Sequence, residues 1–208
     1  MKRESLAIIF ACLALALTAQ DAIKVNYKGA QPTISDFVSA LLSASDNDEE
    51  ECCVDEALNF FANVWNNYHN NIPLQEGETL TIDEKNGYVR LEYSDTYESL
   101  EHVLIIEMCY WNEADGKHKL IAKNVVSLTN GKFDAGQFDG ITFYRYDNAK
   151  KTMTWCYDDR GLEAAYEDED AMHTFALPRT GKDITVTFWH DSGKKERTLK
   201  WNGHRFGL

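Results

Sequence analysis

The sequence has little proline and glycine and few basic residues, and each shortage excludes a class of protein. Three prolines and twelve glycines among 208 residues exclude a collagen-like or proline-rich chain. Lysine and arginine together number 21 against 34 aspartate and glutamate residues, which gives a formal net charge of −13. Because nucleic acids and anionic membranes are bound through clustered Lys and Arg, this balance argues against both as partners.

The sequence also lacks the short motifs that mark common catalytic sites. It contains no GxSxG, HExxH or GxGxxG pattern. Gly181-Lys182 is followed by Asp183, with no glycine five residues before Gly181, so this pair is not a phosphate-binding loop. The six histidines are scattered, and no cysteine has a CxxC or Cys–His ligand spacing. We therefore expect no catalytic residues, no cofactor and no metal site.

A single long apolar run lies at the N-terminus. A short basic start precedes residues 6–17, and Thr18 and Ala19 follow them. This is the layout of a secretory signal peptide, whereas a membrane-spanning helix needs about 20 apolar residues. We expect cleavage after Ala19, with Ala16 as the alternative. The prediction is an exported protein, periplasmic or extracellular, with residues 1–19 as its signal and no membrane span in the mature chain.

Four cysteines follow the signal segment: Cys52, Cys53, Cys109 and Cys156. An even number in an exported chain permits two disulfides, with three possible pairings. A bond between the adjacent Cys52 and Cys53 would be strained, so each is expected to pair elsewhere or stay free. Four free, buried thiols are the alternative, since cysteine is among the most buried residue types.

Helical periodicity marks two segments of the first third of the chain. Residues 33–45 carry apolar side chains at helical spacing, and Thr33 and Asp36 form an approximate capping box at their start. A second helix is predicted for about residues 48–70. The apolar stripe of the first comprises Ile34, Phe37, Val38, Leu41 and Leu42, and that of the second Val54, Ala57, Leu58, Phe61, Val64, Trp65 and Tyr68.

From Glu78 onward the apolar pattern alternates with a period of two, which is typical of strands. Short turns such as Asn86-Gly87 indicate antiparallel hairpins, because parallel strands need long crossovers. We expect one α+β domain over residues 20–208. Helices within about 33–71 would pack on a mainly antiparallel sheet, part-closed barrel or sandwich of about nine strands within 78–206. The predicted strands are 79–83, 88–93, 102–111, 119–126, 141–147, 152–157, 173–177, 183–190 and 196–201.

Two acidic runs have the composition of a cation site. In residues 46–57 the sixth position of a calcium-binding loop would be Glu51 instead of glycine, and the twelfth Ala57 instead of glutamate, so the pattern fails. We expect this run to cap a helix. The run at 167–170 is expected to be a solvated loop.

A resemblance to known proteins rests on the two ends of the chain. The segment Leu17-Thr-Ala-Gln20 resembles the end of export signals in Gram-negative Bacteroidota. The closing Leu199-Lys-Trp-Asn-Gly-His-Arg-Phe206, after helices and a string of hairpins, is similar to endings of small exported proteins of unknown function from that group. The resemblance implies a periplasmic or secreted location, but no activity and no site residue.

The feature that stands out is a set of aromatic residues in or beside predicted strands: Trp111, Tyr144, Tyr146, Trp155, Tyr157 and Trp189. On an exposed sheet face such rings stack on sugars or anchor a partner protein; the alternative is that they form the core. The first hypothesis for function is a non-enzymatic binding or interaction module for an unknown protein, with a basic partner favoured by charge. The alternatives are a carbohydrate-binding module and a carboxylate-dependent hydrolase.

Overall fold

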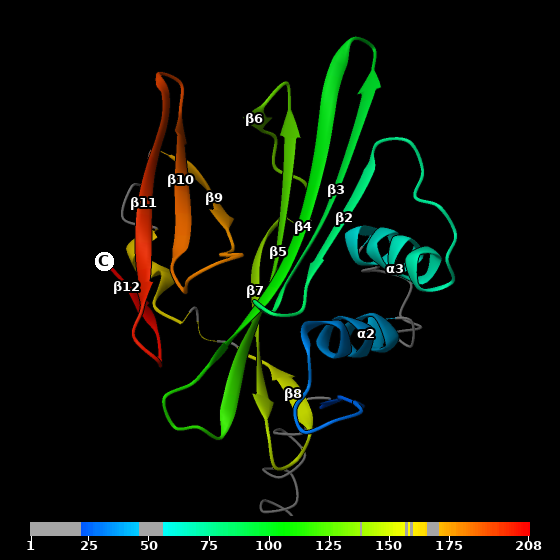
Figure 1. Ribbon diagram of the computed structural model, residues 1–208. Coiled ribbons are helices and arrows are strands. Elements are labelled where there is room, and N and C mark those ends of the chain that lie inside the picture. Colours follow the sequence, from blue (N-terminus) through cyan, green and yellow to red (C-terminus); the bar gives the residue numbers. More distant parts are fainter. Residues whose placement is uncertain (1–21, 46–55, 138, 157, 159, 166–170) are drawn as a thin grey trace, which may run out of the picture.

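The computed structural model describes residues 22–45, 56–137, 139–156, 158, 160–165 and 171–208. These residues form three layers: helices, a large curled sheet and a smaller sheet (Figure 1). The helical layer contains α2 (Ile34–Ser45) and α3 (Glu56–His69), and a short 3₁₀ helix, η1 (Leu162–Ala165), precedes the last strands. Neither α2 nor α3 has the length and apolarity that crossing a membrane requires.

Every strand pair within the described residues is antiparallel. The larger sheet has the order β1-β8-β7-β5-β4-β3-β2, with β6 paired to β5, and the smaller sheet has the order β12-β11-β10-β9. The larger sheet comprises β1 (Ile23–Lys24), β2 (Glu78–Asp83), β3 (Tyr88–Tyr97), β4 (Leu100–Asn112), β5 (His118–Thr129), β6 (Lys132–Phe133), β7 (Gly140–Asp147) and β8 (Thr152–Trp155). The smaller comprises β9 (Met172–Ala176), β10 (Ile184–His190), β11 (Gly193–Trp201) and β12 (Phe206–Gly207).

The α+β class and the mainly antiparallel sheet are confirmed, but two finer predictions are not. The described residues contain twelve strands, three more than predicted, because β1, β6 and β12 are two-residue strands too short to show a period. The second helix was predicted from Asp48, whereas the described part of it begins at Glu56; residues 46–55, with their acidic run, lie outside the described residues. The acidic run at 167–170 lies outside them as well.

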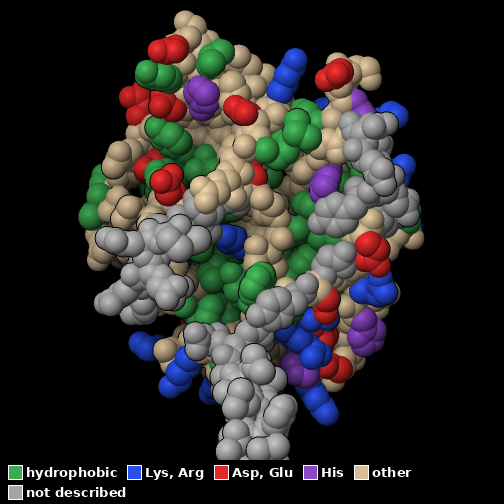
Figure 2. Space-filling view, turned by 180° about the vertical axis from the view of Figure 1, so that it is seen from behind, with side chains coloured by type: hydrophobic (Ala, Val, Ile, Leu, Met, Phe, Trp, Pro, Cys, Tyr) green, Lys and Arg blue, Asp and Glu red, His purple; other side chains and the backbone are tan. Residues whose placement is uncertain are grey.

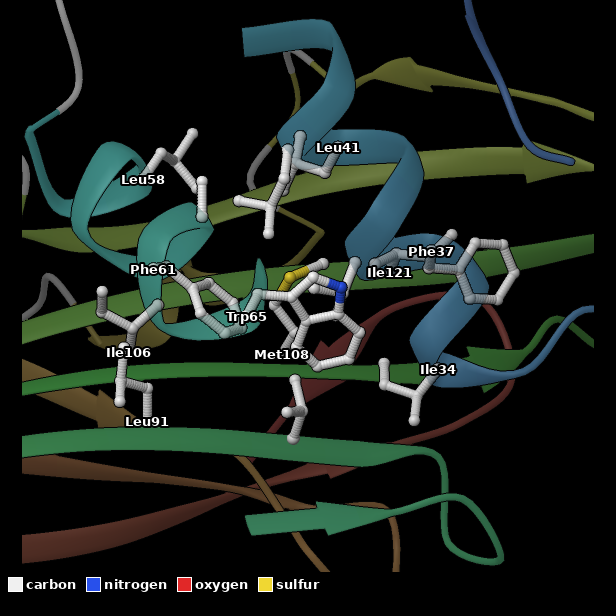
Figure 3. Close-up of a cluster of buried hydrophobic side chains, with 14 of the residues drawn as sticks. Ile34, Phe37, Leu41, Leu58, Phe61, Trp65, Leu91, Ile106, Met108 and Ile121 are labelled. Carbon is white, nitrogen blue, oxygen red and sulfur yellow. The ribbon is translucent and has the colours of Figure 1, made fainter. Parts of the chain in front are cut away.

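One hydrophobic core lies between the helices and the larger sheet (Figure 3). The predicted stripe of α2 is fully buried, and the ring of Phe37 meets Tyr110 and Tyr146 edge-on at centroid distances of 5.4 and 5.1 Å. The N–H of Thr33 donates to Asp36 Oδ2 at 2.7 Å, as the capping box predicted. On α3 the predicted stripe is buried from Ala57 to Trp65, and Val54 lies outside the described residues. Tyr68 is 47% exposed, which corrects its assignment to the apolar face.

A second core fills the space between the two sheets. Ile184, Val186 and Phe188 of β10 all face inward, as their alternation predicted. The turn at Asn202-Gly203 brings Phe206 back into this core, where its ring lies 5.2 Å from that of Trp111. The larger sheet is therefore covered on both faces, by helices on one and by the smaller sheet on the other.

A buried carboxylate, Glu107 on β4, joins the two sheets. Its side chain is 3% exposed and accepts hydrogen bonds from Tyr88 Oη at 2.6 Å and from Arg90 Nη1 at 3.0 Å, both on β3. On β5, Asn124 Nδ2 lies 3.3 Å away, and the N–H of Leu177, just after β9, donates at 3.0 Å. Burial, with Glu107 nearby, raises the pKa of Tyr88, so its hydroxyl remains a donor.

The turn between β2 and β3 makes a second connection between the sheets. Its Gly87 has a φ of +66°, and a Cβ there would lie 2.6 Å from the Tyr110 ring, so this position requires glycine. Asp83 accepts from the backbone and side chain of Asn86 within the turn. Asp83 Oδ2 also accepts from Arg179 Nε at 2.9 Å, which links the turn to the segment before β10.

We expect Glu107→Ala to lower the free energy of unfolding by about 3 kcal/mol or more, because it leaves Arg90 Nη1, the Tyr88 hydroxyl and the Leu177 N–H without their acceptor. Urea unfolding followed by tryptophan fluorescence measures this loss. The matched control is Glu92→Ala, which removes the other, 42% exposed carboxylate paired with Arg90 and should cost less than about 1 kcal/mol. Equal losses in the two variants would contradict the role of Glu107.

Candidate functional site

A groove lies between the start of α3 and the curled sheet. A hollow of about 520 Å³ is bordered by Glu56 and Phe60 of α3, by Tyr93 of β3 and by Asp139 before β7. The rings of Phe60 and Tyr93 are 5.3 Å apart and tilted by 59°. Tyr93 also borders a second hollow of about 620 Å³, which lies between the segment before β2, the end of β3 and the start of β4. We call the two adjoining hollows the Tyr93 groove.

The Tyr93 groove is strongly acidic. Five carboxylates line its two hollows, and the described lining includes no lysine or arginine. Figure 2 shows Asp and Glu side chains gathered at the upper left, the end of the molecule where β3 and β4 turn in Figure 1. The nearby Asp95 carboxylate raises the pKa of Tyr93, which keeps its hydroxyl protonated. The lining carboxylates are Glu56, Glu76, Asp95, Glu101 and Asp139.

One of these carboxylates, Asp139, is held in place by β5 and by its own loop. Asp139 accepts hydrogen bonds from the N–H and Oγ of Ser127, both at 2.9 Å, and from the N–H of Gly136 at 3.1 Å. Three such bonds fix the position of the carboxylate. Asp139 therefore contributes a fixed negative charge to the groove wall, while Phe60 and Tyr93 contribute flat apolar surface.

The aromatic residues singled out in the sequence do not form one surface. Trp111 lies between the sheets and donates from Nε1 to the carbonyl of Lys182 at 2.8 Å, while Tyr146 is buried under α2 on the other face. These two are core residues, which corrects the expectation of an exposed face, because the sheet is covered on both sides. Tyr144 and Trp189 are half-buried, Trp155 is 49% exposed, and Tyr157 lies outside the described residues.

The predicted disulfides are not present among the described cysteines. Cys109 and Cys156 are both free thiols, the first buried between the sheets and the second half-buried. Burial raises the pKa of each thiol, which makes both poor nucleophiles. Cys52 and Cys53 lie outside the described residues, so their state stays a prediction.

A cluster at the β4–β5 turn has the composition of a metal site, which sequence spacing did not indicate. Ligand atoms of Glu113, Asp115 and His118 all lie within 4.8 Å of one another. Arg145 Nη2, from β7, lies 2.6 Å from Glu113 Oε2, 3.2 Å from Asp115 Oδ2 and 3.1 Å from His118 Nδ1. A metal ion there would meet the guanidinium charge. We therefore interpret the cluster as an ion-pair network that fixes the turn.

The residues of the Tyr93 groove were not singled out from the sequence. They come from α3, from β3, β4 and β5 and from two loops, so no local spacing links them. The available signal was Phe60, a large aromatic residue outside the apolar stripe of its helix. Comparisons with protein-family models, with curated proteins and with solved structures found no match.

The Asp115 carboxyl generates a prediction about pH. A hydrogen bond from His118 lowers its pKa from 3.8 to about 2 in the folded protein. Because the folded-state pKa is depressed, this group stabilises the fold fully above about pH 4, and the contribution is lost as the pH falls toward 2. Urea midpoints measured from pH 5 to pH 2.5 should fall less steeply in Asp115→Asn than in the wild type. Parallel pH profiles would show that the network does not stabilise the fold.

Proposed function

We propose that this protein is an exported, non-enzymatic binding module that holds a basic segment of a partner protein in the Tyr93 groove. The observation that carries the proposal is the composition of the groove wall: five carboxylates and two aromatic rings, with no basic side chain among the described lining residues. The export part rests on the N-terminal segment of residues 1–19, outside the described residues, and on the resemblance to exported proteins of the Bacteroidota type.

The chemistry of the wall suits lysine and arginine side chains. A cation within about 6 Å of a tyrosine or phenylalanine face is attracted by the ring quadrupole, and carboxylates accept hydrogen bonds from its N–H groups. The rings of Phe60 and Tyr93 are in contact; Glu56 lines the hollow that both rings border, and Asp95 lines the hollow that only Tyr93 borders. The formal net charge of −13 would speed the approach of a basic partner, most strongly at low salt.

A carbohydrate-binding module is the second candidate. Aromatic rings stack on the apolar faces of sugars, and Trp155 is the most exposed of the described aromatic residues predicted for this role. The groove offers hydroxyl and amide groups from Ser127 and Gln137 as well. The third candidate, a carboxylate-dependent hydrolase, stays a prediction, and no pair of carboxylates is assigned to its catalysis.

The test uses the chain of residues 20–208 and a fluorescent peptide of alternating lysine and glycine. We expect saturable binding by fluorescence anisotropy that weakens from 50 to 150 mM salt. Tyr93→Leu should weaken binding about fivefold, because it removes the ring and keeps apolar bulk, whereas Tyr93→Phe should bind like the wild type.

Charge is tested separately with two double variants of equal net charge. Glu76→Gln with Glu101→Gln removes two groove carboxylates and should weaken peptide binding about tenfold. Glu163→Gln with Glu196→Gln removes two exposed carboxylates elsewhere and should leave it nearly unchanged. Equal weakening by both pairs would show general attraction without a site. Binding to neutral polysaccharide with none to the peptide would favour the carbohydrate alternative.

A further inference from the structure

A hollow outside the Tyr93 groove has the opposite electrostatic character to that groove. It lies at one end of the smaller sheet, where β6 approaches β9 and β10 (Figure 1), and has a volume of about 330 Å³. That volume is at the lower end of the roughly 300–1,000 Å³ typical of small-molecule sites. Its walls are contributed by β6, β9, β10 and β11, and by the turn between the last two.

Three side chains in register across the smaller sheet line the hollow, two of them at its floor and the third, a lysine, at its rim. Trp189 on β10 pairs with Met172 on β9 on one side and with Lys194 on β11 on the other. Side chains directly opposite in an antiparallel sheet lie on the same face, so these three are neighbours. Met172 is 54% exposed, and Phe133 of β6 adds a second ring to the wall.

The tryptophan in this row has a fixed orientation. Trp189 Nε1 donates to Thr174 Oγ1 at 3.0 Å, which satisfies its polar group. Lys194 Nζ lies 5.8 Å from the centroid of the Trp189 ring and 3.6 Å from Glu196 Oε1. Since the lysine side chain is 59% exposed, its ammonium group remains open to a ligand at the rim.

The charge of the rim is the reverse of that of the whole chain. Lys132 and Lys194 border the hollow, and Asp191 is the one carboxylate among the described residues that line it. Two flexible lysines beside an apolar floor fit a ligand with one anionic group and a flat apolar body. An amine of the same shape would meet two ammonium groups against the single Asp191 carboxylate and should bind more weakly.

We propose that this hollow binds a small aromatic carboxylate, with the ring on Met172, Phe133 and Trp189 and the carboxylate between Lys132 and Lys194. The site is separate from the Tyr93 groove and binds a ligand of opposite charge. The ligand class is inferred from the apolar floor and the two lysines at the rim. These lysines stand out because the whole chain has 34 acidic and only 21 basic residues.

The test titrates the chain of residues 20–208 with 4-phenylbutyrate and, separately, with 4-phenylbutylamine, which has the same ring and chain but the opposite charge. Calorimetry should show saturable binding of the carboxylate and at least about tenfold weaker binding of the amine. Met172→Ser should weaken binding of 4-phenylbutyrate, and because Met172 is exposed, the variant should fold normally. No saturable binding of 4-phenylbutyrate, or equal binding of both probes, would overturn the proposal.

Matched charge variants separate a site from general attraction. Lys132→Gln with Lys194→Gln should weaken 4-phenylbutyrate binding about tenfold, whereas Lys195→Gln with Lys200→Gln, outside the lining of the hollow, should not. Equal losses in the two pairs would also overturn the proposal. Glu76→Gln with Glu101→Gln should leave this binding unchanged, so failure of the acidic groove and failure of this site can be told apart.

Discussion

The arrangement of the two sheets depends on the buried carboxylate of Glu107. A carboxylate removed from water is costly unless its oxygens accept several hydrogen bonds. The four donors to Glu107 come from β3, from β5 and from the residue after β9, so its burial is tolerated in one arrangement of these segments. Asn124 strengthens this constraint, because its Nδ2 also donates to the carbonyl of Phe175 at 2.7 Å. Apolar packing alone would allow the smaller sheet to slide, whereas these directional bonds fix its position.

Periodicity in the sequence was enough to find most elements but not to place them in layers. The stripe of α2 and the alternation of Ile184, Val186 and Phe188 identify which side chains share a face. Periodicity cannot tell whether that face is covered. Tyr144 and Tyr146 do lie on one face, as predicted, but α2 covers it. Trp111 lies on the other face, under the smaller sheet, so the set could not form one wet surface.

The candidate sites were out of reach of sequence reasoning because each joins residues that are distant in the chain. Tyr93 meets Phe60 only because α3 packs across the sheet, and Trp189 meets Met172 and Lys194 only through strand register. In the ion-pair cluster, residues that are close in sequence have the composition of a metal site, which the structure does not support. Its acidic residues are close in sequence, but Arg145, which supplies the positive charge, comes from another strand. Spacing indicates a site when its residues share one element, and none of these sites meets that condition.

The basic residues of β11 have a structural consequence as well as the one proposed for ligand binding. β12 pairs with β11 at Lys200 and Trp201, which leaves the described edge of β11 from Gly193 to Leu199 without a neighbouring strand. An open edge invites pairing with another chain, and charged side chains oppose it. Two copies meeting antiparallel at this edge would bring lysines and Arg197 close together. Charges more than about 8 Å apart are largely screened at physiological salt. The potential at this edge is therefore set by its own basic residues and stays positive, although the overall charge of the chain is negative.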